Sequence, residues 1–157
     1  MVIRKLNADQ ARAEPYLIWN AFIDLLATEE HAELSPEQRP AHLAFWYESE
    51  VQNGGHYQYF LNQSGARAAE TVEALVSLGL HAHADVLARA TARWRSQERI
   101  PPSTPDHFIH DAELDEFGDL DRAFHACPQS ITDALSAHLK AHQQAFVDLI
   151  GENSRDA

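Results

Sequence analysis

Apolar residues recur every three or four positions along almost the whole chain, a spacing that is typical of amphipathic helices rather than strands. The last predicted helix, at about residues 128–150, shows the pattern most clearly, with a stripe made of Ile131, Leu135, Leu139, His142, Phe146 and Leu149. No segment alternates convincingly as a strand would, and no internal repeat is present. The sequence therefore predicts an all-α fold, a single compact domain of six to eight mostly antiparallel helices.

Glycines and prolines mark where the predicted helices end. Helices are expected at about residues 14–33, 40–53, 66–79, 81–95, 120–126 and 128–150, with a short one between residues 53 and 65. The stretch "SPEQRP" is typical of a capping box, in which Ser35 caps a helix and Gln38 completes the pair. One domain is expected over residues 1–157, with its core at about 14–150 and flexible ends at 1–10 and 151–157.

The net charge is the second feature of the sequence, and it constrains which partners the protein can bind. The chain holds 12 Lys and Arg against 24 Asp and Glu, so its formal net charge is −12. Nucleic acid and anionic membranes attract basic surfaces, and this balance argues against both as direct partners. The excess is concentrated in an acidic run without any Lys or Arg, made of Asp106, Asp111, Glu113, Asp115, Glu116, Asp119 and Asp121.

Three absences favour a cytoplasmic protein. No apolar run approaches the roughly 18 residues that cross a membrane. The first ten residues contain a basic pair but no apolar stretch after it, which argues against a secretory signal. Cys127 is the only cysteine, so an intramolecular disulfide is excluded.

Chemistry-bearing side chains are present, but their spacing does not favour an enzyme. His138 and His142 lie four apart on the last helix, where two imidazoles can share one metal ion. The stretch "HLKAH" lacks the glutamate of a zinc-protease motif, so these two are weak metal candidates, and hydrogen-bonded core histidines are the preferred interpretation. His125 and Cys127 point to different sides of a helix and do not form a nucleophile pair. The protein is expected to be non-enzymatic and without a cofactor.

The stretch "YESEVQNGGHYQYFLNQSG", from Tyr47 to Gly65, is the most distinctive in the chain. Gly54 or Gly55 is expected to end a helix in the left-handed conformation. Helical spacing places Glu50 on the same face as Leu43 and Tyr47, where its carboxylate is expected to accept hydrogen bonds from backbone amides of the glycine turn. This structural role is preferred over catalysis. A phosphate site is disfavoured, because no glycine-rich phosphate motif, preceding strand or nearby cation accompanies the turn.

This stretch resembles the signature of a bacterial domain family of unassigned function. The motif residues that match it are Glu50, Asn53, Gly54, Gly55, Gln58, Tyr59, Phe60, Asn62, Ser64 and Gly65. The similarity covers about residues 15–150 and departs from the family pattern at His56 and Gln63. The family includes an acidic, all-helical, dimeric DNA-mimic protein, whose surface carboxylates imitate duplex phosphates. The resemblance therefore implies DNA mimicry as a function, without carrying over single surface residues.

The first hypothesis is a non-enzymatic acidic protein that binds a basic, nucleic-acid-binding protein by DNA mimicry. Its binding residues are expected in the acidic run, with Glu29, Glu30 and Glu33 as a second patch, and charge reversal of Asp115, Glu116 and Asp119 should abolish partner capture. The alternatives are an immunity or stress interaction module without mimicry, and a metal-binding or enzymatic domain that uses Glu50, His56, His138 and His142. A homodimer is also compatible with the apolar faces of the first and last helices.

Overall fold

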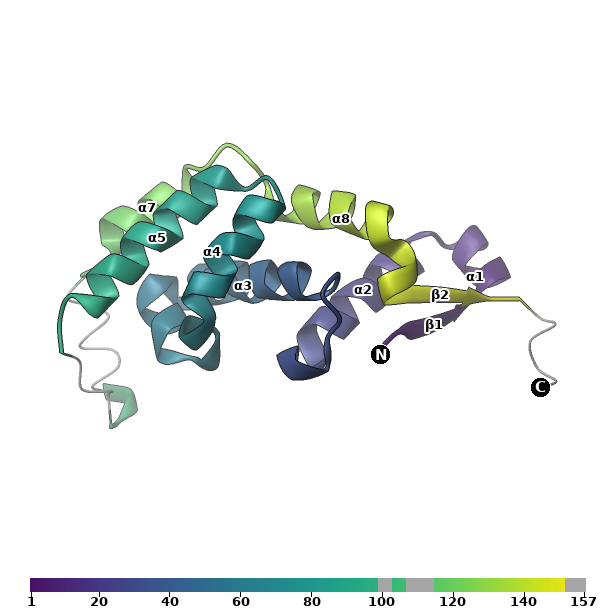
Figure 1. Ribbon diagram of the computed structural model, residues 1–157, viewed down its shortest axis with the longest axis horizontal. Coiled ribbons are helices and arrows are strands. Elements are labelled where there is room, and N and C mark those ends of the chain that lie inside the picture. Colours follow the sequence, from purple (N-terminus) through teal and green to yellow (C-terminus); the bar gives the residue numbers. More distant parts are fainter. Residues whose placement is uncertain (99–102, 107–114, 152–157) are drawn as a thin grey trace.

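Helix α3 runs through the middle of the molecule and contacts α2, α4, α7 and α8 (Figure 1). The computed structural model describes residues 1–98, 103–106 and 115–151. The described elements are β1 (Arg4–Asn7), α1 (Ala8–Ala13), α2 (Tyr16–Thr28), η1 (His31–Glu33), α3 (Arg39–Leu61), η2 (Gln63–Arg67), α4 (Ala68–Ser77), α5 (His81–Arg95), α7 (Gly118–His125), α8 (Ile131–Phe146) and β2 (Val147–Ile150). The predicted all-α domain is confirmed, with one small sheet added to it.

Aromatic side chains hold the helices together. Tyr47 of α3 makes edge contacts with Tyr59, with ring centroids 5.2 Å apart, and with Phe124 of α7 at 5.4 Å. Phe22 of α2 meets Phe146 of α8 at 4.8 Å, also edge to face. Tyr47, Tyr59, Phe22 and Phe146 are all fully buried. Each such pair adds about 0.5–1.5 kcal/mol beyond the apolar area that it buries.

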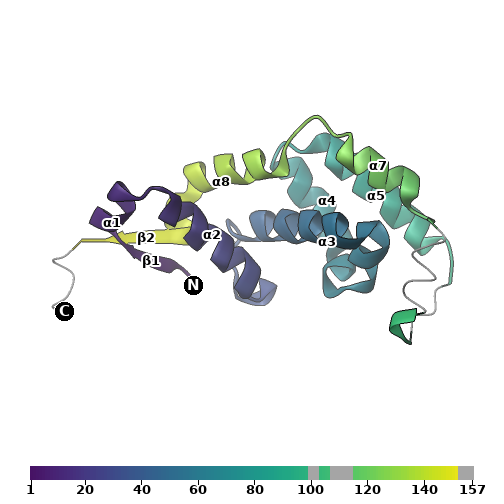
Figure 2. The ribbon, with the colours of Figure 1, turned by 180° about the vertical axis from the view of Figure 1, so that it is seen from behind.

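The glycine pair bends α3 at the predicted position. Gly55 has φ +69° and Gly54 departs from helical geometry, so the helix breaks and restarts within Arg39–Leu61. The predicted positive φ at this glycine pair is confirmed, but the ψ of −174° places Gly55 outside the left-handed helical region that was expected. Gly79 has φ +78° and closes α4, and the next amide, that of Leu80, donates to the Leu75 carbonyl at 2.8 Å. This closure joins α4 and α5 through a short connection, as Figure 2 shows from behind.

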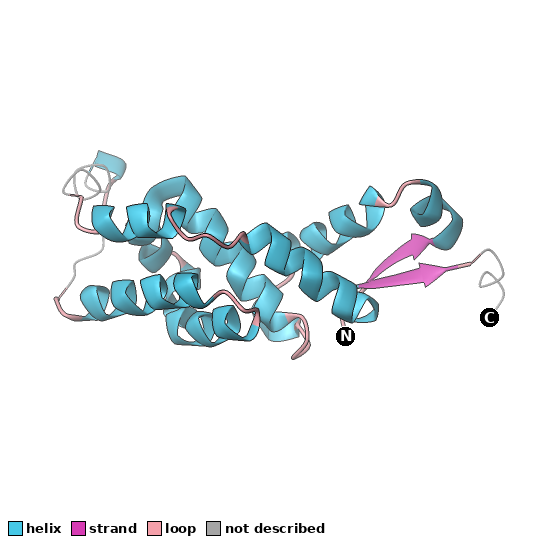
Figure 3. Cartoon of the chain, turned by 90° about the horizontal axis from the view of Figure 1, so that it is seen from above, coloured by secondary structure: helices cyan, strands magenta, loops and turns pink. Residues whose placement is uncertain are grey.

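The two strands were not predicted. β1 pairs with β2 in parallel, with Arg4 opposite Val147 and Asn7 opposite Ile150, and Figure 3 shows the pair at one end of the molecule. The N-terminal residues, expected to be flexible, are instead ordered as β1 and α1. The predicted final helix ends at Phe146 rather than near residue 150, because the last four residues extend into β2. Residues 152–157 of the expected flexible tail lie outside the described residues.

Gln38 links this sheet to the helical body. Its Nε2 donates to the carbonyls of Val2 and Ala145, both at 2.6 Å, while its Oε1 accepts from the Ser35 amide at 2.9 Å. The last bond is the glutamine half of the predicted capping box. Gln38 is fully buried, so one side chain satisfies three backbone groups from distant parts of the chain.

None of the described helices is both long and apolar enough to cross a membrane.

Candidate functional site

The acidic run leads into α7, and much of its described charge is paired. Asp106 is exposed, whereas Asp111 and Glu113 lie outside the described residues. Arg93 of α5 donates to both oxygens of Asp119, at 2.6 and 2.9 Å, and this bond lowers the Asp119 pKa to about 2. Arg93 also donates to the Glu116 carbonyl at 2.9 Å. Reversing the charge of Asp119 would therefore break an ion pair as well as change the surface.

Asp115 is the most open described acid next to α7, with 70% of its side chain exposed. It has φ +51°, and Arg122 Nη1 lies 4.0 Å from its carboxylate. An ion pair at such a long distance between two exposed side chains contributes little to stability. The Asp115 carboxylate is therefore hardly neutralised by Arg122 and remains exposed to solvent. Asp106 and Asp115 are thus the described members of the run best placed to meet a partner.

The carboxylate of Asp121 is bonded to a buried histidine. Its Oδ1 accepts from the backbone amide of His56 at 2.9 Å and lies 2.6 Å from the His56 Nδ1. The other ring nitrogen of His56 lies 2.8 Å from the hydroxyl of Tyr47. Tyr47 and His56 are fully buried, and burial raises the pKa of Tyr47 well above its usual range. The Tyr47–His56–Asp121 chain resembles a proton relay, but burial of its tyrosine and imidazole indicates a structural role.

Glu50 is also buried, with 8% exposure, but its partners differ from those expected. Its Oε2 accepts from the side-chain amides of Gln58 at 2.8 Å and Asn62 at 2.5 Å. Asn53 in turn donates to Gln58 at 3.2 Å. The prediction that Glu50 binds backbone amides of the glycine turn was wrong, because the bend directs the His56 amide toward Asp121 instead.

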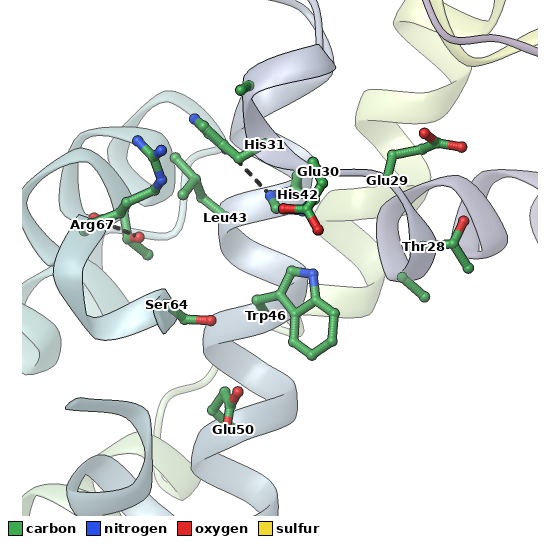
Figure 4. Close-up of a pocket in the computed structure, with 13 residues that line it drawn as sticks. Thr28, Glu29, Glu30, His31, His42, Leu43, Trp46, Glu50, Ser64 and Arg67 are labelled. Carbon is green, nitrogen blue, oxygen red and sulfur yellow. Dashed lines mark hydrogen bonds between the residues drawn. The ribbon is translucent and has the colours of Figure 1, made fainter. Parts of the chain in front are cut away.

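A cavity of about 350 Å³ lies on the other side of Glu50, between the α2–α3 connection, α3 and η2 (Figure 4). The side chains around it in Figure 4 include Glu30, His31, Trp46, Glu50, Ser64 and Arg67. Trp46 donates its indole N–H to the Leu26 carbonyl at 3.1 Å, which fixes the ring at the cavity wall. No pattern in the sequence indicated this cavity, because its lining comes from segments with no shared spacing.

Two histidines form one wall of the cavity. The Nδ1 atoms of His31 and His42 lie 3.3 Å apart, and the His31 Nε2 lies 3.7 Å from a carboxylate oxygen of Glu70 on α4. Burial and the neighbouring His31 lower the pKa of His42 to about 4, and burial also lowers the pKa of His31. Both rings are therefore neutral near pH 7, and one donates the hydrogen bond that the other accepts.

Two members of the second acidic patch, Glu29 and Glu30, line this cavity. Glu29 is bound by Arg4 at 2.7 Å and is 26% exposed, so its charge is compensated. Glu30 and Glu33 are exposed, and neither has an ion pair within the part of the chain that the structure describes. The His31–Glu70 contact brings α4 to the same place, where Glu70 and Glu73 lie one turn apart.

We expect acid to destabilise the fold through His42. An unfolded histidine has a pKa near 6.5, so between about pH 6.5 and pH 4 the unfolded chain binds a proton that the folded chain excludes. The contribution of neutral His42 to the free energy of unfolding should therefore be fully present above pH 6.5. It should decrease by about 1–3 kcal/mol as the pH falls toward 4. Urea unfolding at pH 7 and pH 5 measures this change. His42→Gln cannot titrate and should show a shallower pH dependence; equal slopes in both proteins would contradict the prediction.

The weak metal candidates on α8 lie next to each other, without a third potential ligand among the described residues. His138 donates from Nε2 to the Glu37 carbonyl at 2.7 Å, and the His138 and His142 rings lie 4.5 Å apart. His142 is exposed and has non-helical backbone angles, so it leaves the apolar stripe to which its spacing assigned it. Among the described residues, no three or more His, Cys, Asp or Glu side chains are grouped to hold a metal ion.

Comparison with known proteins supports the resemblance at the level of the family. No curated protein and no solved structure matches the chain. A family model described as "DMP19-like protein" matches residues 32–142, from η1 to the kink of α8. The match includes the bend at Gly54–Gly55, Glu50 and most of the cavity lining, while β1, α1, α2 and β2 lie outside it. Because it covers more than half of the 157 residues, the chain belongs to the DMP19-like protein family.

Proposed function

We propose that this protein is a non-enzymatic acidic protein that binds a basic, DNA-binding protein by imitating the charge of a duplex. A formal charge of −12 supports a basic partner, since such a charge attracts basic surfaces and repels nucleic acid. The resemblance to a family with a DNA-mimic member supports the same proposal. Cytoplasmic location is part of it, because DNA-binding partners work there in bacteria.

The observation that carries the proposal is the uncompensated charge of the second patch. Glu30 and Glu33 are exposed and lack an ion pair among the described residues, and Glu73 of α4 is exposed as well, whereas Glu70 is paired with Arg67 at 3.0 Å. By contrast, Arg93 pairs with Asp119, and His56 occupies Asp121. Within the described chain, Glu30 and Glu33 therefore have more charge available for a partner than the acids of α7.

Duplex DNA presents one charge per about 1.7 Å of its axis, and proteins that bind it lose affinity steeply with salt. A protein that occupies the same basic groove should show the same salt dependence and should be displaced by DNA. Glu30 and Glu33 are the residues that we assign to this contact, with Asp106 and Asp115 of the acidic run as a separate group of exposed acids.

The test is affinity capture from native lysate at low and high salt. The immobilised protein should retain a basic protein at low salt and release it when a short DNA duplex is added. Polyglutamate of equal charge should release it much less, because mimicry depends on the spacing of charges as well as their number. The double variant Glu30→Lys, Glu33→Lys should lose about tenfold or more of the capture.

A matched control keeps the total charge change the same. The variant Asp9→Lys, Glu14→Lys replaces two exposed acids around α1, at the sheet end of the molecule. It should capture the partner almost as well as the unchanged protein. If both double variants lose capture equally, net charge rather than the patch is responsible; if polyglutamate and DNA release the partner equally, mimicry is wrong.

A further inference from the structure

The cavity beneath the second patch has more negative than positive charge in its lining. Glu29 is paired with Arg4, and Arg67 is paired with Glu70 at 3.0 Å. Glu30 has no ion pair within the described residues, and Glu50 brings a carboxylate into a place where it is 92% shielded from solvent. An anion held in such a place is stable only when hydrogen bonds or a cation compensate it.

Glu50 is compensated on one oxygen only. Both of its hydrogen bonds, from Gln58 and Asn62, reach Oε2. Oε1 accepts no hydrogen bond from any residue that the structure describes, although the side chain lines the cavity. The carboxylate therefore has an open acceptor at the floor of a pocket, which solvent or a donor group of a ligand can satisfy.

Trp46 supplies an aromatic wall between the two carboxylates. Figure 4 shows its ring between Glu30 above and Glu50 below, with the Ser64 hydroxyl opposite. The bond from its indole N–H to Leu26 holds the ring in place before any ligand arrives. A planar cation can stack on such a ring while its edge donates to a carboxylate, and arginine combines these two abilities in one side chain.

We propose that this cavity is the socket for one arginine side chain of the partner protein, with the guanidinium stacked on Trp46 and donating to Glu50 Oε1. Glu30 stands at the entrance and attracts the same charge. This proposal rests on the proposed function, because it takes its ligand from the basic partner. It adds a specific anchor of the kind that dominates the affinity of protein interfaces, where arginine and tryptophan are enriched.

The first test needs no partner. Titration of ¹⁵N-labelled protein with N-acetyl-L-arginine amide should shift the indole N–H signal of Trp46 with a millimolar dissociation constant. N-acetyl-L-citrulline amide, which is nearly the same shape but neutral, should bind at least about fivefold more weakly. Equal binding of the two probes, or no shift of the Trp46 signal, would overturn the proposal.

Substitutions in the cavity then test whether the arginine probe binds there. Glu50→Gln removes the charge and should weaken binding of the arginine probe about fivefold or more, whereas Glu48→Gln, two residues earlier on α3, should leave it unchanged. Trp46→Leu is the second variant, and it keeps the test decisive if Glu50→Gln does not fold. Thermal unfolding shows which variants are folded, and unchanged probe binding in both folded variants would overturn the proposal.

Capture of the partner protein distinguishes the failure of the arginine socket from the failure of the proposed function. If the unchanged protein captures a DNA-releasable partner and the Trp46→Leu variant captures it equally well, the socket is wrong and the proposed function stands. If no basic partner is captured but the arginine probe binds and depends on Glu50, the proposed function fails and the cavity remains a guanidinium site for another ligand.

Discussion

Replacing Gly55 with alanine should destabilise the fold by about 3 kcal/mol or more. At φ +69°, an L side chain is strained by about 1–2 kcal/mol. In addition, a Cβ at this position would overlap the carboxylate of Asp121, whose Oδ1 is bonded to both the backbone and the ring of His56. Moving Asp121 away would therefore leave a buried imidazole without its partner, which costs a further 1–3 kcal/mol or so. Urea unfolding at pH 7 measures the loss.

Gly79 provides the matched control for this substitution. Its φ of +78° is almost the same, but a Cβ there would meet no atom within 4 Å. Gly79→Ala should therefore cost only the backbone strain, about 1–2 kcal/mol. The difference between the two variants then reports the contact with Asp121 together with any extra strain from the ψ of −174° at Gly55. Equal losses would show that the contact contributes nothing and that conformational strain alone explains the requirement for glycine.

Replacing Gln38 with alanine should have the second large effect, a loss of about 2–4 kcal/mol. The side chain is fully buried and bonds to the backbone of Val2, Ser35 and Ala145. Alanine would leave two carbonyls and one amide without their partner and would open a cavity where the side chain was. Exposed Gln52, whose contact with Glu48 is 3.3 Å long, is the control, and Gln52→Ala should change stability by less than about 0.5 kcal/mol.

The Gln38 prediction also has a local readout. Because the amide group holds both the start of the chain and the end of α8, its removal should loosen β1 before the helical body unfolds. Hydrogen exchange at Lys5 and Leu6 should accelerate more than exchange at Leu75 or Leu87 of the core. If exchange increases uniformly at all four residues, Gln38 supports the whole domain and not the terminal sheet in particular.

Local patterns were enough to predict most of the helices and the bend, although α1 was missed. The 3.6-residue period identified α8 and most of α3, and the paired glycines identified the break at Gly55, because each of these signals lies within a few neighbouring residues. Glu50 was placed inward by the same period, and it is buried. The hydrogen-bond partners predicted for Glu50 were wrong, because the direction in which the chain leaves the bend depends on packing against α7.

Long-range contacts were beyond the reach of such patterns. β1 and β2 are four residues each, too short to show an alternating pattern, and each is stabilised by the other across almost the whole sequence. Asp121 was assigned to a surface because it belongs to an acidic run, yet its partner is His56, which lies 65 residues earlier. The contact between His31 and His42 likewise results from the turn between α2 and α3, and no spacing rule predicts it.

The parallel sheet has a consequence for synthesis of the chain on the ribosome. β1 is made long before its partner, Val147–Ile150, so this strand stays without its partner while the helices between the two are made. During that time the backbone groups of Arg4–Asn7 have no strand to pair with, and the Gln38 amide lacks the Ala145 carbonyl. Contacts of such high sequence separation close late because the loop must be ordered first. The nascent chain should therefore assemble α3, α4 and α5 early and pair β1 with β2 only after Val147–Ile150 has left the ribosome.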